Sequence, residues 1–290
     1  MQPTPIEWCD FTSNPVKARQ RTTGKVGWHC VKISTGCAHC YAEKINARFG
    51  TGLPYNREAS AKVDLFASVK ELKAIEKRQK PTRIFMGDMT DLFQEDVTFE
   101  MLDAIMQTVF VCPQHTFIFL TKRAQRMHDY FQSVYMRIGH IQWNVWGMVS
   151  VENQETADER IPWLIKTPLF VRGLSVEPLL APIDLALESQ YRNRLLHWTI
   201  VGGEIGPGSR PCDIVDVRDI VDQCQSQHIP VFVKQLGAKP VGDWGETAAS
   251  PSWDKDGAWR LKSRKGADPS EWPEDLRVRE FPDRRVSSLP

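Results

Sequence analysis

Three closely spaced cysteines are the residues of this chain whose types and spacing best suit chemistry. Cys30, Cys37 and Cys40 follow the pattern C-x6-C-x2-C, which brings three thiols into one short loop. A closed structural zinc site has four protein ligands, and no obvious fourth ligand follows nearby. An iron–sulfur cubane is usually held by four thiolates, so a cubane held by three would leave one iron open for chemistry. The spacing therefore predicts an iron–sulfur cluster with an open position.

Two other interpretations of the same residues stay open. His39 could be the fourth ligand of a zinc site, although a place between Cys37 and Cys40 is poor for closing a tetrahedron. The three thiols could instead be ordinary packing residues, because free cysteine is often buried.

The other four cysteines lack this spacing. Cys112, Cys212 and Cys224 are isolated in sequence and are expected to be packing residues. Cys9 is ambiguous, because its segment could end near the cysteine loop. Seven is an odd count and the N-terminus lacks a secretion signal, so a disulfide scaffold is not expected.

The composition is that of an ordinary soluble protein, with 41% hydrophobic and 25% charged residues. A net charge of +1 provides no global field for nucleic acid, so such a partner has to be argued from local patches. No apolar run approaches the roughly 18 residues of a membrane span. We therefore expect a cytoplasmic protein with no membrane partner, and no oligomeric state is indicated.

The cysteine loop must be positioned by a fold in which strands and helices alternate. Seven apolar strands are expected over residues 6–11, 83–87, 115–121, 145–150, 169–175, 198–201 and 230–234. Amphipathic helices are expected over residues 42–49, 65–79, 99–110, 124–135, 156–165 and 215–227. This alternation indicates a parallel sheet covered by helices. The predicted fold class is α/β, a partial (β/α) TIM-like barrel of parallel strands, with an open doubly wound sheet as the alternative.

Two segments stand outside the alternation. Residues 17–25 carry four basic side chains and no acid, which suits either a solvated loop or a phosphate-contacting arm. Residues 238–290 have little periodicity, but their four tryptophans are too many for a disordered tail. We expect a barrel at 1–237 with its cluster loop at 30–40, and an irregular C-terminal extension or lid at 238–290. Its last residues, 282–290, are expected to be frayed.

Polar and charged residues follow the predicted strands one after another. In parallel α/β folds the active site lies at the carboxyl ends of the strands. The candidates at these ends are Gly87, Asp88, Thr90, Asp91, Lys122, Ser150, Asn153, Glu177 and Glu204. Loops carry polar residues by default, so any one of these is a weak signal. The unbroken series predicts a site on one rim.

Several of these residues also have a purely structural interpretation. Asp88 or Asp91 could cap the following helix, which is a frequent role for aspartate. Lys122 and Arg123 could be a solvated helix start, although cations there oppose the helix dipole and so need a reason. Glu177 precedes a proline, is therefore extended, and could simply face solvent.

Six short motifs, in order along the chain, carry a resemblance to a known family. They are Cys-x2-Cys-Tyr-Ala at 37–42, Gly-Asp-Met-Thr-Asp-Leu-Phe at 87–93, Ser-Val-Glu-Asn at 150–153, Leu-Ser-Val-Glu-Pro-Leu-Leu at 174–180, Val-Gly-Gly-Glu at 201–204 and Asp-Pro-Ser-Glu-Trp-Pro-Glu-Asp-Leu-Arg at 268–277. With them the chain resembles a phage-associated three-cysteine protein family, a divergent branch of the radical SAM enzymes. More distantly it is similar to spore photoproduct lyase, a radical SAM DNA-repair enzyme.

The resemblance implies a [4Fe–4S] cluster on Cys30, Cys37 and Cys40. S-adenosylmethionine (SAM) would bind the open iron, and an external electron donor would drive its cleavage to methionine and a 5′-deoxyadenosyl radical that abstracts hydrogen from a substrate. The resemblance also implies the roles of the rim. Cofactor contacts would come from Tyr41, Gly87, Asp88, Thr90, Ser150 and Asn153. Catalytic roles would fall to Asp88, Asp91, Lys122, Glu177 and Glu204.

Two features depart from the usual radical SAM pattern. The first cysteine gap is six residues where three is usual, which concerns Cys30. The Gly-Gly-Glu segment at 202–204 comes much later than the one that binds the methionine amino group in many of these enzymes, so that role is not transferred. Its glycine pair either admits close approach of a ligand or makes a turn.

The predicted function is a radical SAM enzyme, with a nucleotide or nucleic-acid base as the expected substrate. The alternative is a non-catalytic zinc or iron–sulfur module that binds nucleic acid or a partner protein. The two differ in metal content, about four irons per chain against one zinc.

Overall fold

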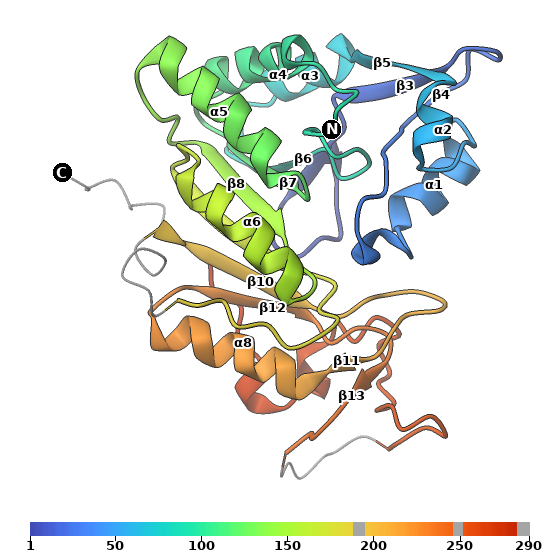
Figure 1. Ribbon diagram of the computed structural model, residues 1–290, viewed down its shortest axis with the longest axis vertical. Coiled ribbons are helices and arrows are strands. Elements are labelled where there is room, and N and C mark those ends of the chain that lie inside the picture. The colour runs from blue at the N-terminus through green and yellow to red at the C-terminus, as the bar shows by residue number, and fades with distance from the viewer. Residues whose placement is uncertain (188–194, 246–251, 283–290) are drawn as a thin grey trace. The chain divides into compact units, whose positions relative to one another are not determined.

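The computed structural model describes residues 1–187, 195–245 and 252–282, and the fold is mixed α/β with mostly parallel strands (Figure 1). The chain forms two compact units. The first contains residues 1–149 and 166–170, and the second contains residues 150–165 and 171–290. The predicted α/β class is confirmed.

The first unit is built on a sheet whose parallel strands follow one another in chain order. These are β2 (Phe11–Ser13), β6 (Arg83–Met86), β7 (Thr116–Thr121) and β8 (Val145–Ser150), with the short β1 (Gln2–Pro3) antiparallel on the edge. All six residues of β8 are buried. Strands covered on both faces need continuous apolar sequence, which explains why these strands were visible in the sequence.

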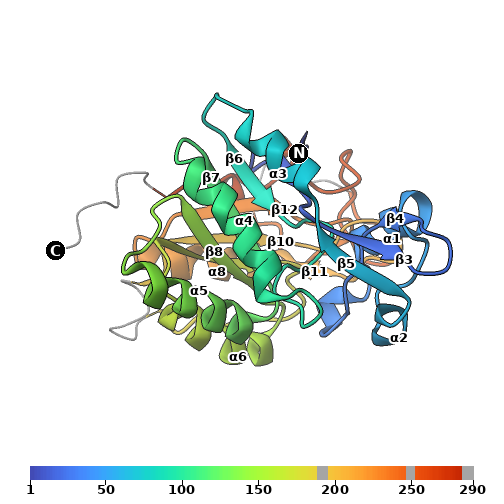
Figure 2. The same cartoon turned by 90° about the horizontal axis from the view of Figure 1, so that it is seen from above.

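Helices α3 (Val69–Glu76), α4 (Phe99–Val111) and α5 (Ala124–Ile138) belong to the same unit, and both views place α4 and α5 along the outside of the strands (Figures 1 and 2). Helix α4 buries Leu102, Ile105, Met106 and Val109, the stripe that its sequence spacing predicts. Helix α5 ends at Gly139, which adopts the left-handed conformation that favours glycine. These helices were predicted to within a few residues.

A second, antiparallel sheet in the first unit corrects two predictions. The basic segment 17–25 is not a loop throughout. Its first four residues belong to β3 (Val16–Gln20), which pairs with β4 (Val26–Gly27) and with β5 (Val63–Ala67), and its last five connect β3 to β4. The predicted helix over 65–79 is therefore too long at its start, because its first residues pair with β3 and the helix begins only after the N-cap Ser68.

The basic side chains of β3 have partners inside the protein. Lys17 lies 4.7 Å from the ring centre of Trp28 and 3.4 Å from Glu71. Arg19 lies over the ring of Phe66. Arg21 pairs with Asp64 at 2.9 Å. Three of the four basic residues of this segment thus contribute to the small sheet.

The first predicted strand is also displaced. Residues 6–10 form a turn in which the Cys9 amide donates to the Ile6 carbonyl, and the strand itself covers Phe11–Ser13. The apolar residue Trp8 is buried against Phe85 from within that turn. The alternation of apolar and polar residues over 6–11 therefore predicted which side chain is buried, but not which residues pair as a strand.

The second unit has three parallel strands, again in chain order: β9 (Val171–Val176), β10 (Trp198–Gly202) and β12 (Val231–Gln235). Its helices are α6 (Gln154–Lys166) and α8 (Ile214–Ser226). Two residues, Cys212 and Asp213, form β11, which pairs with β13 (Pro240–Val241). Each of the seven predicted strands thus has a counterpart in the structure.

The described part of the C-terminal segment is irregular but packed. Trp244, Trp259 and Trp272 are buried, and short 3-10 turns form at η2 (Pro269–Glu271) and η3 (Glu274–Leu276). The Val233 amide donates to the Val278 carbonyl, which ties the segment to β12. The domain boundary at 237 and the role of a lid stay predictions. The predicted frayed end lies outside the described residues, apart from Pro282.

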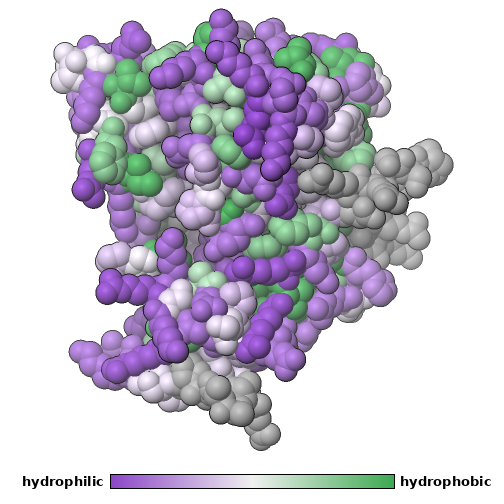
Figure 3. Space-filling view, turned by 180° about the vertical axis from the view of Figure 1, so that it is seen from behind, coloured by the Kyte–Doolittle hydropathy of each residue, from purple (hydrophilic) through white to green (hydrophobic). Residues whose placement is uncertain are grey.

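Within the described ranges, no helix is both long and apolar enough to cross a bilayer. On the face that Figure 3 shows, hydrophobic residues lie scattered among hydrophilic ones.

Gly147 in the middle of β8 occupies a position without space for a side chain. A Cβ there would lie 2.3 Å from Cδ1 of the buried Leu169. We predict that Gly147→Ala lowers the free energy of unfolding by about 1–3 kcal/mol through overpacking. In a Leu169→Ala background the same change should cost less, because the obstructing atoms are gone. Urea unfolding of the two single variants and the double variant measures this, and strict additivity would contradict the contact.

Candidate metal and cofactor site

The three cysteines lie in the first unit, in the segment between β4 and α1 (Tyr41–Phe49). Cys37 ends the 3-10 turn η1 (Thr35–Cys37), and Cys40 is the N-cap of α1. Cys30 and Cys40 both pack against one buried cluster, formed by Ala42, Tyr55 and Met89. The fold therefore gathers the first and third cysteines at the same place.

The start of this segment is anchored by Asn46 of α1. Its side-chain oxygen accepts hydrogen bonds from the Trp28 and Thr51 amides, each at 3.0 Å, and its side-chain nitrogen donates to the Thr51 hydroxyl and to the Leu53 carbonyl. All four hydrogen bonds of one buried amide are thereby used to fix the chain on both sides of α1.

Burial favours the neutral form of two of the three thiols, Cys30 and Cys40. Burial raises the pKa of Cys30 to about 12, with a smaller contribution from Asp91 that Arg123 opposes. Burial also raises the pKa of Cys40, against hydrogen bonds from the Glu43 and Ala42 amides. Charge on Cys40 further disfavours ionisation of Cys30, and charge on Cys37 disfavours ionisation of Cys40. A cation beside these thiols would favour the thiolate forms that bind metals.

The chemical type of these side chains suits a metal group, but their observed arrangement does not yet form one. Thiolates are the donors that iron–sulfur clusters and zinc prefer. All seven cysteines are free, and the three of the loop are half-buried whereas the other four are buried. Yet among residues 1–187, 195–245 and 252–282, no group of three or more His, Cys, Asp or Glu side chains is arranged so that it could hold a metal ion. The three thiols are thus suitable metal donors, and in the observed loop conformation they are not arranged as a metal-binding group.

The burial of Cys112, Cys212 and Cys224 confirms that they are packing residues. Cys9 is also buried, in the turn before β2.

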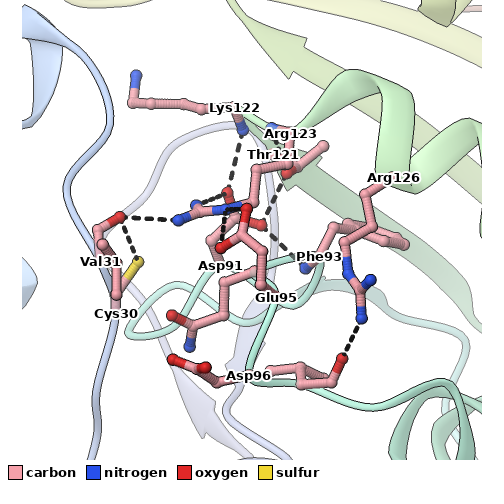
Figure 4. Close-up of polar contacts among 12 residues, drawn as sticks. Cys30, Val31, Asp91, Phe93, Glu95, Asp96, Thr121, Lys122, Arg123 and Arg126 are labelled. Atoms are coloured by element: carbon pink, nitrogen blue, oxygen red, sulfur yellow. Dashed lines mark hydrogen bonds and ion pairs between the residues drawn. The ribbon is translucent and has the colours of Figure 1, made fainter. Parts of the chain in front are cut away.

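Asp91 is the centre of the polar network beside the cysteine loop (Figure 4). One carboxylate oxygen accepts from the Thr121 hydroxyl at 2.7 Å and from the Phe93 amide at 2.9 Å. The other accepts from the Lys122 amide and from the guanidinium of Arg123, both at 3.1 Å. The carboxylate thus accepts four hydrogen bonds within the protein and organises the loops after β6 and β7, while its predicted catalytic role stays a prediction.

Arg123 is buried at the junction of β7 and α5, where its sequence position suggested a solvated helix start. Its guanidinium donates to the Val31 carbonyl at 2.9 Å, and to the carboxylates of Asp91 and Glu95. Two carboxylates offset its charge, which is the reason that a cation can occupy this helix start. The side chain of the neighbouring Lys122 points away from this network (Figure 4).

Asp88 has a different environment from Asp91. Its Oδ1 accepts from the Asn14 amide group at 2.7 Å, and its backbone carbonyl accepts from the Tyr41 hydroxyl at 2.8 Å. Burial raises the pKa of the Asp88 carboxyl, while the hydrogen bonds from Asn14 and Thr12 oppose the shift. Tyr41 therefore ties the helix that starts at Cys40 to the end of β6.

The turn between these two aspartates needs glycine and leaves one polar group orphaned. Gly87 has φ +84°, and a Cβ there would lie 2.6 Å from Leu92 and 2.7 Å from the Thr90 carbonyl. The Thr90 hydroxyl is buried and makes no hydrogen bond with the described residues. Buried hydroxyls are rarely left unpaired. Thr90 is therefore a fitting contact for a bound ligand.

The predicted site residues Ser150 and Asn153 belong to the second unit, where they form hydrogen bonds that stabilise the start of α6. Asn153 Oδ1 accepts from the Thr156 amide and hydroxyl, and the Thr156 hydroxyl accepts in turn from the Glu152 amide. The Ser150 carbonyl accepts from Arg160, whose guanidinium also pairs with the fully buried Glu152 at 3.1 Å. The motif at 150–153 thus starts α6, and a cofactor contact by Asn153 receives no support from its side-chain bonds.

The ends of β9, β10 and β12 come together within the second unit. Glu177 accepts from the Lys234 ammonium at 2.5 Å and from the Gln235 amide at 2.8 Å, and Gln235 also donates to the Gly203 carbonyl. Glu204 forms a two-pronged ion pair with Arg210. Glu177 is therefore paired rather than simply turned to solvent.

The glycine pair at 202–203 serves backbone packing. A Cβ on Gly203 would lie 2.6 Å from the Leu236 carbonyl and 2.9 Å from Gly237. The close approach that the sequence suggested is thus to another strand end.

Several residues of the site were not predicted. No sequence pattern indicates a role for Asn14, Tyr55 or Glu95, and for Arg123 the sequence indicates only a helix start with an unfavourable charge. Each acts through a partner far away in sequence, such as Asn14 with Asp88. Only the unfavourable charge of Arg123 at a helix start gave a signal that could have identified it.

We predict that Arg160→Leu destabilises the second unit by about 3–5 kcal/mol, because Glu152 would keep a buried charge without its partner. Adding Glu152→Gln should recover much of this loss. Urea unfolding followed by tryptophan fluorescence compares the single and double variants. If the free energy of unfolding of Arg160→Leu lies within about 0.5 kcal/mol of that of the wild type, the ion pair does not stabilise the unit as predicted.

Comparison with known proteins identifies a family without giving an activity. The sequence model of the family described as "Protein of unknown function (DUF5131)" matches residues 3–268. No curated protein and no solved structure matches the chain. Because the matched stretch covers most of the 290 residues, the chain belongs to the DUF5131 family.

Proposed function

We propose that this protein is a radical SAM enzyme whose [4Fe–4S] cluster is held by Cys30, Cys37 and Cys40. One observation carries the proposal: Cys30 and Cys40 pack against one buried cluster, in the segment that also contains Cys37 and beside the loops that follow β6 and β7. When bound, the cluster would supply the electron that cleaves SAM into methionine and a 5′-deoxyadenosyl radical. The protein's part is to bind, orient and shield the reactants.

The residues of the first unit suit that part. Asp88 would accept a hydrogen bond from the amino group of SAM. Its Oδ1 is held by the Asn14 side chain at 2.7 Å, and a carboxylate can accept several further hydrogen bonds. The orphaned hydroxyl of Thr90 would contact the same ligand. The apolar surface of Tyr55, Ala42 and Met89 would limit water around two of the cysteines.

A partial β/α barrel and a cytoplasmic location are part of the proposal. Strand order that follows chain order within each unit supports the barrel, because a doubly wound sheet reverses its order at a switch point. Seven free cysteines support a reducing compartment. Membership of the phage-associated three-cysteine family is also part of the proposal.

A nucleotide or nucleic-acid base is the proposed substrate, on the analogy with spore photoproduct lyase. The basic segment 17–25 supports it less than its sequence suggested, because Lys17, Arg19 and Arg21 have partners within the protein. The substrate class therefore rests on the analogy, and the expected role of Lys122 stays a prediction.

The first prediction concerns the ligands. After anaerobic reconstitution with iron and sulfide, wild-type protein should hold about four irons per chain and form 5′-deoxyadenosine from SAM with dithionite. Cys37→Ala should lose the iron–sulfur absorbance and the product, because one of three protein ligands is gone. Absorbance spectra, iron analysis and chromatography provide the measurements.

Cys112→Ala is the matched control, since this buried thiol of the same unit is far from the loop in sequence. Equal loss in both variants would contradict the ligand assignment. One bound zinc with no cluster would favour the non-catalytic module instead.

The second prediction concerns Asp88. Asp88→Asn keeps an acceptor for Asn14 but removes the charge, so the cluster should assemble normally while SAM binds about tenfold more weakly. Since burial raises the pKa of Asp88, wild-type affinity should fall with decreasing pH earlier than for an ordinary aspartate, and the variant should lack this dependence. Equilibrium dialysis with labelled SAM measures both.

Asp64→Asn, at an exposed carboxylate paired with Arg21, is the control. Unchanged affinity in Asp88→Asn would remove Asp88 from the SAM site.

A further inference from the structure

We propose that Arg123 is a positioning residue for Cys30, which it fixes before any metal arrives; this inference rests on the proposed cluster site. Its guanidinium donates to the carbonyl of Val31, the residue directly after Cys30, at 2.9 Å (Figure 4). The two residues lie 92 positions apart in sequence. The contact thus links the loop of the cysteines to the junction of β7 and α5.

Arg123 can hold that carbonyl because it is itself immobilised. Its side chain is only 6% exposed and is bonded to Asp91 at 3.1 Å and to Glu95 at 3.2 Å. Asp91 is fixed in turn by the Thr121 hydroxyl and the Phe93 amide. A guanidinium held on two sides by carboxylates has one remaining direction in which to donate, and the Val31 carbonyl occupies it.

The same network contacts Cys30 directly. The Cys30 thiol lies 3.8 Å from the carbonyl oxygen of Val31, which also accepts from Arg123. The next residue is held from the other side, because the Lys32 amide donates to the Tyr55 carbonyl at 3.4 Å and its ammonium pairs with Glu43. The two residues that directly follow Cys30 are therefore fixed by residues outside the loop.

Cys37 is held differently. Its thiol contacts the hydroxyl of Ser34 at 3.8 Å, within the same short turn. Its contact thus lies within its own turn, whereas Cys30 is fixed through Val31 from outside the loop.

The test starts from metal-free protein, so it does not depend on activity. In Arg123→Gln, amide hydrogen exchange in the peptide over residues 28–34 should speed up by about tenfold, because the charged hydrogen bond to Val31 is lost. The peptide over β7 (Thr116–Thr121) should exchange as in the wild type. Arg126→Gln is the matched control, since Arg126 lies one turn further along α5 and donates to the Val97 carbonyl instead.

A second measurement follows loss of iron from the reconstituted proteins to a chelator, read as decay of the cluster absorbance. Weakening a partner of a ligand residue typically costs 10- to 100-fold in metal retention, and we expect loss in Arg123→Gln to be faster by about that factor. Arg123→Lys keeps the charge but cannot reach a carbonyl and two carboxylates together, so its loss rate should fall between the two. This variant also serves if Arg123→Gln does not fold.

Wild-type exchange at 28–34 in Arg123→Gln, or equal acceleration in the β7 peptide, would overturn the positioning role. Equal effects of Arg123→Gln and Arg126→Gln would do the same. Failure of the wild type to assemble any cluster would instead refute the proposed function. The exchange result on metal-free protein stands apart from that outcome.

Discussion

The buried ion pair between Arg123 and Asp91 is the constraint on which the rest of the candidate site depends. Removing two charges from water is costly unless every hydrogen-bonding position is used, and here nearly all are. The carboxylate takes four donors, from Thr121, Phe93, Lys122 and Arg123 itself. The guanidinium then has a fixed direction for the Val31 carbonyl. One pair thus sets the ends of β6 and β7 and one flank of the cysteine loop.

The neighbouring aspartates show how environment divides two similar residues three positions apart. Asp91 is saturated by donors and acts as a support. Asp88 is buried, has its pKa raised by that burial, and keeps capacity for a further donor. Raised pKa values and unsaturated acceptors are features of functional carboxylates, whereas saturated ones are usually structural. The orphaned Thr90 hydroxyl lies between them in the same turn.

In the second unit, the polar and glycine motifs at the strand ends stabilise the fold. Asn153 and Thr156 begin α6, and Glu152 is neutralised by Arg160. Gly203 admits the backbone of residues 236–237. Glu177 and Glu204 are paired at the ends of their strands with Lys234 and Arg210. Polar residues at strand ends are therefore not equivalent: within each unit, the partners contributed by other segments decide which ones remain available to a ligand.

The sequence by itself determined the α/β class, six of the seven predicted parallel strands, most helices, and the distinction between the three loop cysteines and the buried Cys112, Cys212 and Cys224. These follow from local properties, namely apolar runs, helical periodicity and thiol spacing. Only the tertiary structure decided that residues 17–20 belong to a strand, that Asp91 accepts four hydrogen bonds, and that Arg123 reaches Val31. Strand pairing and buried hydrogen bonds join residues tens of positions apart, so no window of sequence contains both partners. The pairing of β3 with β5 and the contact of Asn14 with Asp88 arise in the same way.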